Sequence, residues 1–174
     1  MKNFQKNFQI LVTDCINAHS RPIKPSKAVR KWDGQTPYSV HPIWCAMMIL
    51  HETALPEDIR ADGSQALLFH DVLEDTLAEL PDYLSARVKE LVSDMTFESS
   101  DEEMVKVWDK SIEVKLLKLY DKVSNLMDSS WMSEQKLKRY QEYTLKLARE
   151  VEMAYGMLNI IKLAESIIPA DHFK

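Results

Sequence analysis

Glycine is scarce in this chain of 174 residues, which has only Gly34, Gly63 and Gly156. The turns that cradle phosphate groups in P-loop and dinucleotide-binding proteins need several glycines close together. The sequence therefore excludes a nucleotide site of either kind. Leu, Lys, Glu, Ala and Met are abundant instead, and this composition favours helices over sheet.

Cysteine is nearly as rare, and a long apolar run is missing. Cys15 and Cys45 each lie in an apolar helical pattern, which predicts buried free thiols rather than a disulfide framework. No run approaches the roughly 18–20 apolar residues of a membrane span. The first residues also lack the continuous apolar core of a signal peptide. We therefore expect a cytoplasmic protein without a membrane partner.

Positive charge is in deficit, with 22 Lys and Arg against 27 Asp and Glu and a formal net charge of -5. This balance argues against a nucleic-acid partner, because nucleic-acid binding needs a basic footprint. The segment 20–39 is the exception, with five basic residues and one acid. Either this segment binds a small anionic ligand or it is a solvated loop, and its charge alone does not decide between them.

The chain length and its 45% hydrophobic content fit one domain that buries a sizeable core. Apolar residues recur at helical spacing in segments near 4–19, 42–53, 64–76, 81–95, 101–128 and 133–168, and none shows convincing strand alternation. The prediction is a single all-α domain over residues 1–174, folded as a helical bundle. The long segment 20–40 has no sustained period, and loops of that length in compact domains are often functional.

Several residues predict where these helices begin and end. Pro42 and Pro81 suit the first position of a helix, where the missing N–H is not needed. Ser100 and Glu103 fit a capping box, which predicts a helix start near residue 101. The helix of 101–128 is expected to break before Ser111 and to resume through Asp128. Ser133 is expected to open the last helical region, which Gly156 bends or divides.

One histidine and three carboxylates interrupt an apolar run between residues 66 and 75. Read as a helix, the run places His70 over Glu74 and Asp71 over Asp75 on two adjacent rows. Unpaired carboxylates among apolar neighbours are costly. We therefore expect a cation at this stretch, and a bound metal ion is the leading candidate.

Two further residues are candidates for the same ion. His41 lies at the predicted start of a helix, and Asp121 lies in an otherwise core-like sequence. Taken alone, Asp121 fits a helix flank on which it pairs with Lys118 or Lys122. Taken with His70 and Asp71, the set of two histidines and two carboxylates suits manganese, iron, magnesium or zinc.

A metal ion in such a site can polarise a phosphoryl group and lower the pKa of a water molecule. Glu74 and Asp75 lie one turn further on, where they can handle the proton of that water. They are the candidate catalytic residues.

The order His41, His70-Asp71, Asp121 resembles the signature of the HD phosphohydrolase superfamily. The surrounding sequence motifs resemble those of RelA/SpoT-type hydrolase domains and occur in the same order as in that family. They span about residues 15–145, and helices continue to about residue 168. These motifs are Arg30-Lys31…Pro37-Tyr38…His41-Pro42, Ala66-Leu67-Leu68-Phe69-His70-Asp71-Val72-Leu73-Glu74-Asp75-Thr76, Leu91-Val92-Ser93-Asp94-Met95-Thr96 and Lys118-Leu119-Tyr120-Asp121-Lys122-Val123-Ser124-Asn125-Leu126. The length is that of the small stand-alone hydrolases.

The resemblance implies a helical bundle of the HD type and hydrolysis of the 3′-diphosphate of guanosine alarmones, (p)ppGpp, with release of pyrophosphate. It implies a metal ion, usually Mn²⁺, and a small phosphorylated nucleotide as substrate. The implied metal ligands are His41, His70, Asp71 and Asp121, and the implied catalytic pair is Glu74 and Asp75. The implied substrate-binding residues are Arg30 at the base, Lys31 near the phosphates, Asn125 in the nucleoside pocket, and Arg139 and Tyr143.

The chain departs from the family motifs at two places. Tyr120 replaces a small residue before Asp121, and residues 21–26 do not follow the motif that usually precedes the arginine matched by Arg30. Two other functions remain as alternatives. One is a different HD-type phosphatase, acting on nucleoside 5′-monophosphates or NADPH. The other is a nucleotide-binding module without catalysis, against which the intact Glu74 and Asp75 count.

Overall fold

The computed structural model describes residues 2–169, with side chains from residue 7 onward. This part of the chain folds into nine α-helices and two short 3-10 helices, and contains only isolated β-bridges. The α-helices are α1 (Lys2–His19), α2 (Val40–Leu50), α3 (Glu57–Phe69), α4 (Val72–Asp75), α5 (Ala86–Met95), α6 (Ser100–Lys106), α7 (Ile112–Met127), α8 (Glu134–Tyr155) and α9 (Asn159–Ile167), and the 3-10 helices are η1 (Pro25–Lys27) and η2 (Val107–Asp109). The predicted all-α fold is confirmed.

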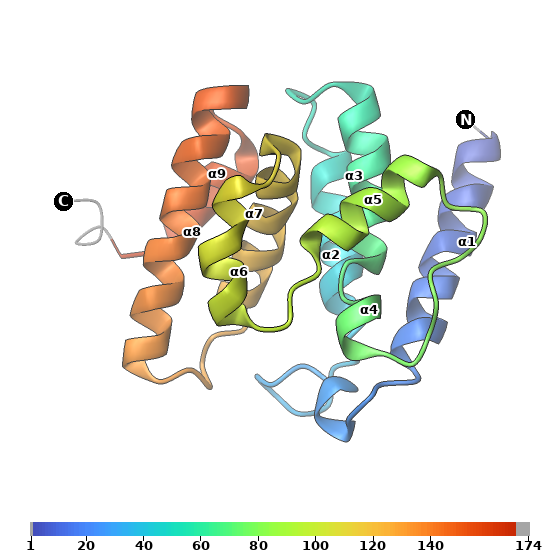
Figure 1. The fold of residues 1–174 in the computed structure, drawn as a ribbon, viewed down its shortest axis with the longest axis horizontal. Coiled ribbons are helices and arrows are strands. Elements are labelled where there is room, and N and C mark those ends of the chain that lie inside the picture. Colours follow the sequence, from blue (N-terminus) through green and yellow to red (C-terminus); the bar gives the residue numbers. More distant parts are fainter. Residues whose placement is uncertain (1, 170–174) are drawn as a thin grey trace.

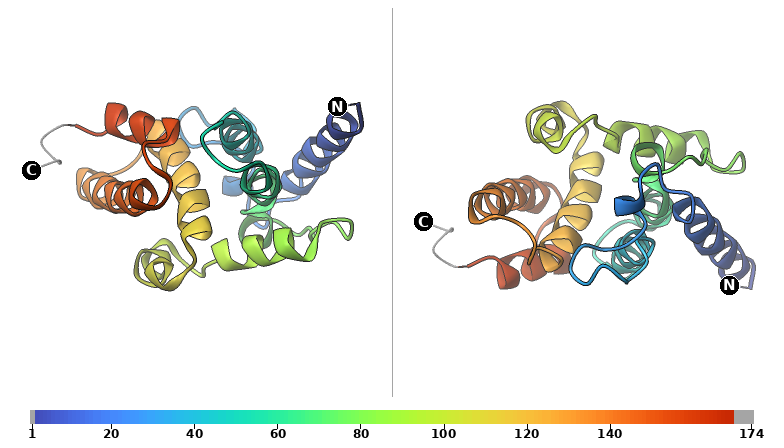
Figure 2. Two further views of the ribbon diagram at one scale, coloured as in Figure 1. Left: turned by 90° about the horizontal axis from the view of Figure 1, so that it is seen from above. Right: turned by 90° about the horizontal axis from the view of Figure 1, so that it is seen from below.

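Helix α7 is the central element of the bundle. It lies between α2 and α3 on one side and α8 and α9 on the other (Figure 1, Figure 2). Leu116, Leu117, Leu119 and Val123 of this helix are fully buried. Burial of each such side chain contributes about 1.5–3 kcal/mol, so packing of these side chains fixes the position of α7 in the bundle.

A single large hydrophobic cluster joins the two ends of the bundle. It extends from Leu11 and Cys15 on α1 to Ile160 and Ala164 on α9. The cluster therefore packs helices from both ends of the described chain together. Cys15 and Cys45 are buried free thiols, as predicted. None of the described helices combines the length and apolar character that a membrane span needs.

Serine side chains begin four of the helices. The hydroxyl oxygens of Ser85, Ser99, Ser111 and Ser133 each accept a hydrogen bond from a backbone N–H of the first turn, which replaces a partner the helix cannot supply. The predicted starts at Ser111 and Ser133 and the division at Gly156 are confirmed. The predicted capping box is wrong by one residue, because the N-cap of α6 is Ser99.

Three other predicted boundaries differ from the structure. Helix α2 begins at Val40, before Pro42, and α5 begins at Ala86 rather than at Pro81. Helix α3 begins at Glu57 rather than near residue 64. In α5 the side chain of Ser85 sets the start, because its hydroxyl oxygen accepts a hydrogen bond from the first turn. The side chain of Pro81 cannot accept one.

The helix predicted over 64–76 is divided at His70 and Asp71. The Nδ1 atom of His70 donates to the carbonyl of Leu67 at 2.7 Å, and Asp71 has φ -94° and ψ -2°. The imidazole thus donates to the Leu67 carbonyl, which in a continuous helix would accept from the backbone N–H of Asp71. Helix α4 resumes with a hydrogen bond of 2.9 Å from Asp75 N–H to Asp71 O. Asp75 therefore still lies one turn beyond Asp71.

The segment between α1 and α2 is tied to α4 by its backbone. Ile23 N–H donates to Asp75 O, and Leu77 N–H donates to Arg21 O, both at 2.9 Å. An isolated bridge joins Pro22 to Thr76 at the same place. These bonds make the segment a fixed wall beside α4.

Gly63 marks the close approach of α3 to α2 and α7. A Cβ atom at this position would lie 2.8 Å from Ile49 Cδ1 and 3.0 Å from Leu117 Cδ2. Both neighbours are fully buried, and close packing in a protein interior restricts their movement. We predict that Gly63→Val lowers the free energy of unfolding by about 1–3 kcal/mol, the usual effect of overpacking, in urea melts. The control Glu90→Val places valine at an exposed position of α5 and should change it by less than about 0.5 kcal/mol.

Candidate active site

Four side chains from three parts of the fold meet at one point. His41 comes from α2, His70 and Asp71 from the junction of α3 and α4, and Asp121 from α7. The two Nε2 atoms lie 3.2 Å apart. His41 Nε2 is 3.5 Å from Asp71 Oδ2 and 3.3 Å from Asp121 Oδ1. The structure thus brings together all four residues predicted as metal ligands.

The hydrogen bonds of the ring nitrogens fix how the histidines face this point. Leu67 O can only accept, so His70 Nδ1 carries a proton and Nε2 of the neutral ring presents its lone pair. His41 Nδ1 contacts Ser124 Oγ at 2.8 Å, which likewise leaves its Nε2 for the cluster. A hydrogen bond behind each ring is the usual arrangement for metal-binding histidines.

The carboxylates create a strong demand for positive charge here. Burial lowers the pKa of His70, but Asp71 and Asp121 outweigh burial and raise it to about 9. Burial likewise opposes ionisation of Asp71, yet His70 and His41 lower its pKa to about 2. In the metal-free state the carboxylates therefore keep a second proton on the buried His70 ring. This imidazolium supplies positive charge at the point where the ligand atoms converge.

A divalent cation fits this donor set. His41, His70 and Asp121 each offer one atom, and these atoms all lie within 4.8 Å of one another. Asp71 Oδ2 lies 3.2 Å from His70 Nε2, so it can serve the same ion. Imidazole with carboxylate and without thiolate is a set that several divalent ions accept.

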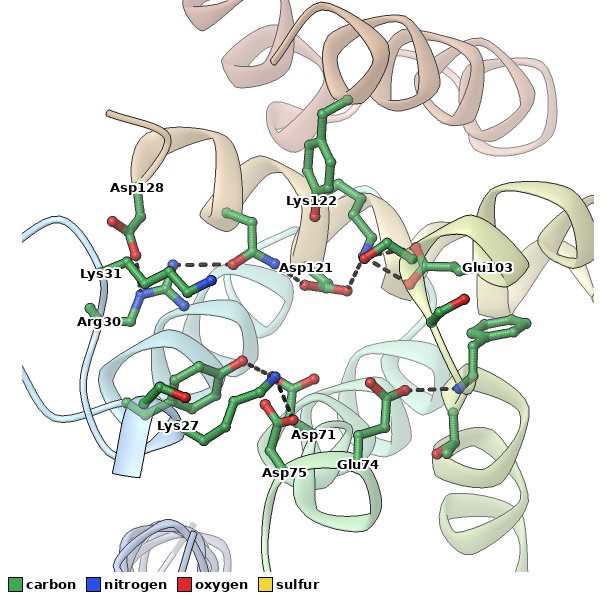
Figure 3. Close-up of a pocket in the computed structure, with 18 of the residues that line it drawn as sticks. Lys27, Arg30, Lys31, Asp71, Glu74, Asp75, Glu103, Asp121, Lys122 and Asp128 are labelled. Atoms are coloured by element: carbon green, nitrogen blue, oxygen red, sulfur yellow. Dashed lines mark hydrogen bonds and ion pairs between the residues drawn. The ribbon is translucent and has the colours of Figure 1, made fainter. Parts of the chain in front are cut away.

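The two aspartates also line a cavity of about 730 Å³ (Figure 3). Glu74 and Asp75, the predicted catalytic pair, lie on its wall beside Asp71. Glu74 Oε1 accepts from the backbone N–H of Phe97 at 2.9 Å. Burial and the charge of Asp71 raise the pKa of Glu74 to about 7. Glu74 can therefore take up or release a proton near neutral pH.

Asp75 has a cationic partner that the sequence did not reveal. Lys27 Nζ, from η1, lies 2.7 Å from Asp75 Oδ1. Burial and Asp71 raise the pKa of Asp75, and Lys27 counteracts both. The pinned segment before α2 is thus one wall of the cavity. Lys27 brings one of the positive charges of this segment to the cavity wall.

Arg30 is held in place by α7. Its Nε atom lies 2.7 Å from Asp128 Oδ2, and its Nη2 atom donates to Asn125 Oδ1 at 3.2 Å. Asn125 in turn donates to Asp121 Oδ1 at 2.6 Å. Asp121, Asn125 and Asp128, in order along α7 and its C-terminal end, therefore connect the cluster of histidines and carboxylates to the guanidinium.

Lys31 lies at the mouth of the cavity, with Nζ 3.8 Å from the ring centre of Trp131. Partial burial lowers the pKa of Lys31, and the positive charges of Lys136 and Lys27 lower it further. Positive charge gathered at an open mouth favours an anionic ligand.

The last two predicted substrate residues lie apart from this cavity. Arg139 lines a smaller neighbouring cavity and pairs with Asp101. Tyr143 is buried, and its hydroxyl donates to Glu103 Oε1 at 2.9 Å. The structure places Tyr143 behind the wall of the site and not on it. The ring of Tyr143 packs against Trp108 within the hydrophobic cluster. The sequence around Tyr143 does not reveal this contact.

Comparisons with known proteins agree with this arrangement. The human guanosine-3′,5′-bis(diphosphate) 3′-pyrophosphohydrolase MESH1 is 31% identical over 142 residues, which cover 71% of this chain and 75% of the human protein. The Xenopus tropicalis protein of the same name is 28% identical over 139 residues, covering 69% and 74%. No protein-family model matches the chain.

A solved structure shows the same fold. It is described as a metazoan ortholog of SpoT that hydrolyses ppGpp and plays a role in starvation responses. It matches with a TM-score of 0.66 and 23% identity, over 90% of this chain and 93% of that one. The long helices and their order are thus shared well beyond the site.

The raised pKa of Glu74 predicts a pH-dependent effect of Glu74→Gln on the metal-free protein. The folded state binds this proton more tightly than the unfolded state, so wild-type stability falls as the pH rises from about 4.5 through about 7. A neutral glutamine avoids this loss and keeps an oxygen for Phe97 N–H. In urea melts with chelator, Glu74→Gln should be more stable than wild type by about 1–3 kcal/mol at pH 8, and nearly equal at pH 5.

The control for this prediction is Glu142→Gln on the exposed face of α8, which should change stability equally at both pH values. Equal stability of Glu74→Gln and wild type at pH 8 would contradict the raised pKa.

Proposed function

The chain belongs to the family of guanosine-3′,5′-bis(diphosphate) 3′-pyrophosphohydrolases of the HD type, and we propose that it hydrolyses (p)ppGpp. In this reaction water removes the 3′-diphosphate as pyrophosphate and leaves GDP or GTP. One observation carries the proposal most directly: a cation site, a carboxyl group that titrates near neutrality and a fixed arginine all face one cavity of nucleotide size.

We assign the metal site to His41, His70, Asp71 and Asp121, and its ion to Mn²⁺. Such an ion supplies positive charge that polarises the phosphoryl group and promotes loss of a proton from water. His70 is held through Nδ1 by Leu67 O, and Asp121 is held by Asn125 at Oδ1 and by two lysines at Oδ2. The ligands therefore need little rearrangement to bind.

Hydrolysis breaks the bond between ribose O3′ and phosphorus. The water oxygen joins the phosphorus, and O3′ leaves with a proton. Glu74 is the group we assign to the water proton, because its Oε1 atom is occupied by Phe97 N–H and its second oxygen remains for the water. Asp75, held by Lys27, lies beside it and orients the same water.

Arg30 is placed to recognise the base. Its contacts with Asp128 and Asn125 fix the plane of the guanidinium, and a fixed plane suits stacking on a nucleobase. Lys27 and Lys31 lie on the same wall and can neutralise phosphate charge. The wall itself is bonded to α4, so the site is formed before substrate arrives.

Purified protein with Mn²⁺ should release pyrophosphate from ppGpp, measured by coupled pyrophosphate detection. Asp71→Ala should reduce the rate by at least about a thousandfold, since it removes an ion ligand. The control Asp109→Asn, at an exposed position of η2, should retain the wild-type rate.

A substrate panel separates this function from its alternatives. Turnover of nucleoside 5′-monophosphates or NADPH without turnover of ppGpp would assign the protein to another HD-type phosphatase. Binding of Mn²⁺ and ppGpp without turnover of any phosphate ester would instead indicate a nucleotide-binding module.

A further inference from the structure

A buried glutamate on α6 lies behind the proposed metal site. Glu103 is 6% exposed, although its sequence position suggested only a helix-capping role. Its carboxylate accepts from Lys118 Nζ at 3.0 Å, from Lys122 Nζ at 2.8 Å and from the hydroxyl of Tyr143 at 2.9 Å. Three donors hold both oxygens, so Glu103 has one fixed orientation.

The same two lysines contact Asp121. Lys122 Nζ lies 2.9 Å from Asp121 Oδ2, and Lys118 Nζ lies 3.5 Å from it. Figure 3 shows Lys122 between Asp121 and Glu103. The other oxygen, Oδ1, faces His41 Nε2 at 3.3 Å. Asp121 therefore presents Oδ2 to the lysines and Oδ1 to the ion site, and Oδ1 also accepts from Asn125 Nδ2 at 2.6 Å.

Charge balance explains why a second carboxylate is needed. Two ammonium groups and two carboxylates are buried together, with exposed fractions from 2% to 6% for all four residues. A buried charge without a partner is strongly destabilising. Without Glu103, both lysines would have Asp121 as their sole carboxylate among these contacts. They would then draw its electron density and its position away from the ion.

We propose that Glu103 is a positioning residue for the metal ligand Asp121 and acts through Lys118 and Lys122. It shares the two ammonium charges, so that Asp121 remains a strong ligand with Oδ1 turned to the ion. This role rests on the proposed metal site, but it concerns ion affinity and not the identity of the substrate.

The first experiment measures Mn²⁺ affinity of the full chain by titration calorimetry. Glu103→Gln should weaken Mn²⁺ binding by about 10–100-fold, the usual effect of changing a residue behind a metal ligand. Lost ppGpp turnover should return at saturating Mn²⁺. The control Glu150→Gln breaks the ion pair between Glu150 on α8 and Lys115 on α7, which does not involve Asp121. This variant should bind Mn²⁺ as wild type does.

A double-variant comparison separates charge sharing from simple loss of packing. Lys118→Met removes one of the two ammonium groups, so in its background Glu103→Gln should weaken Mn²⁺ binding less than about threefold. If Glu103→Gln alone does not fold, the pair Lys118→Met and Lys118→Met/Glu103→Gln still gives this comparison.

Wild-type affinity in Glu103→Gln, or a tenfold loss in the Lys118→Met background, overturns the role of Glu103. Wild-type protein that binds Mn²⁺ yet leaves ppGpp intact overturns the proposed hydrolysis and leaves the role of Glu103 standing. Wild-type protein that binds no Mn²⁺ overturns both.

Discussion

The convergence of two imidazoles and two carboxylates on one buried point is the constraint on which the rest of the site depends. Lone pairs and negative charges placed this close repel one another unless a cation lies among them. In the metal-free state, a proton on His70 supplies part of that charge, which is why the pKa of His70 is raised to about 9. A divalent ion satisfies the same demand with ligands that already point inward.

Helix α7 connects this cluster to the rest of the molecule. Along one face, Asp121 reaches the ion site, Asn125 links it to Arg30, and Asp128 holds the guanidinium. On its other flank, Lys122 joins Asp121 to α6. Because α7 is packed between the two halves of the bundle, these side chains keep their spacing. The positions of Arg30 and of the proposed ion site thus depend on one well-buried helix.

Much of this could be predicted from the sequence, because helical periodicity and serine caps are local signals. The all-α fold and the starts of α7 and α8 follow from them. The histidines and carboxylates within apolar helical runs, together with the resemblance, indicated the four residues proposed as metal ligands. The break at His70 was not predictable in this way, since it depends on an imidazole that takes a particular carbonyl. Glu103 was also missed, because its partners on α7 are distant in sequence and its spacing from Ser100 imitates a cap. Asp121 has the geometry of both interpretations: it pairs with lysines, and it lies 3.3 Å from His41 in the cluster proposed as the ion site.

Diffraction from crystals grown with Mn²⁺, recorded with the anomalous signal of manganese, tests the central claim most directly. The account predicts one strong peak about 2.0–2.6 Å from His41 Nε2, His70 Nε2, an oxygen of Asp71 and Asp121 Oδ1, the range expected for nitrogen and oxygen ligands. A peak held by Glu74 and Asp75 without the histidines, or no peak at saturating Mn²⁺, would contradict it.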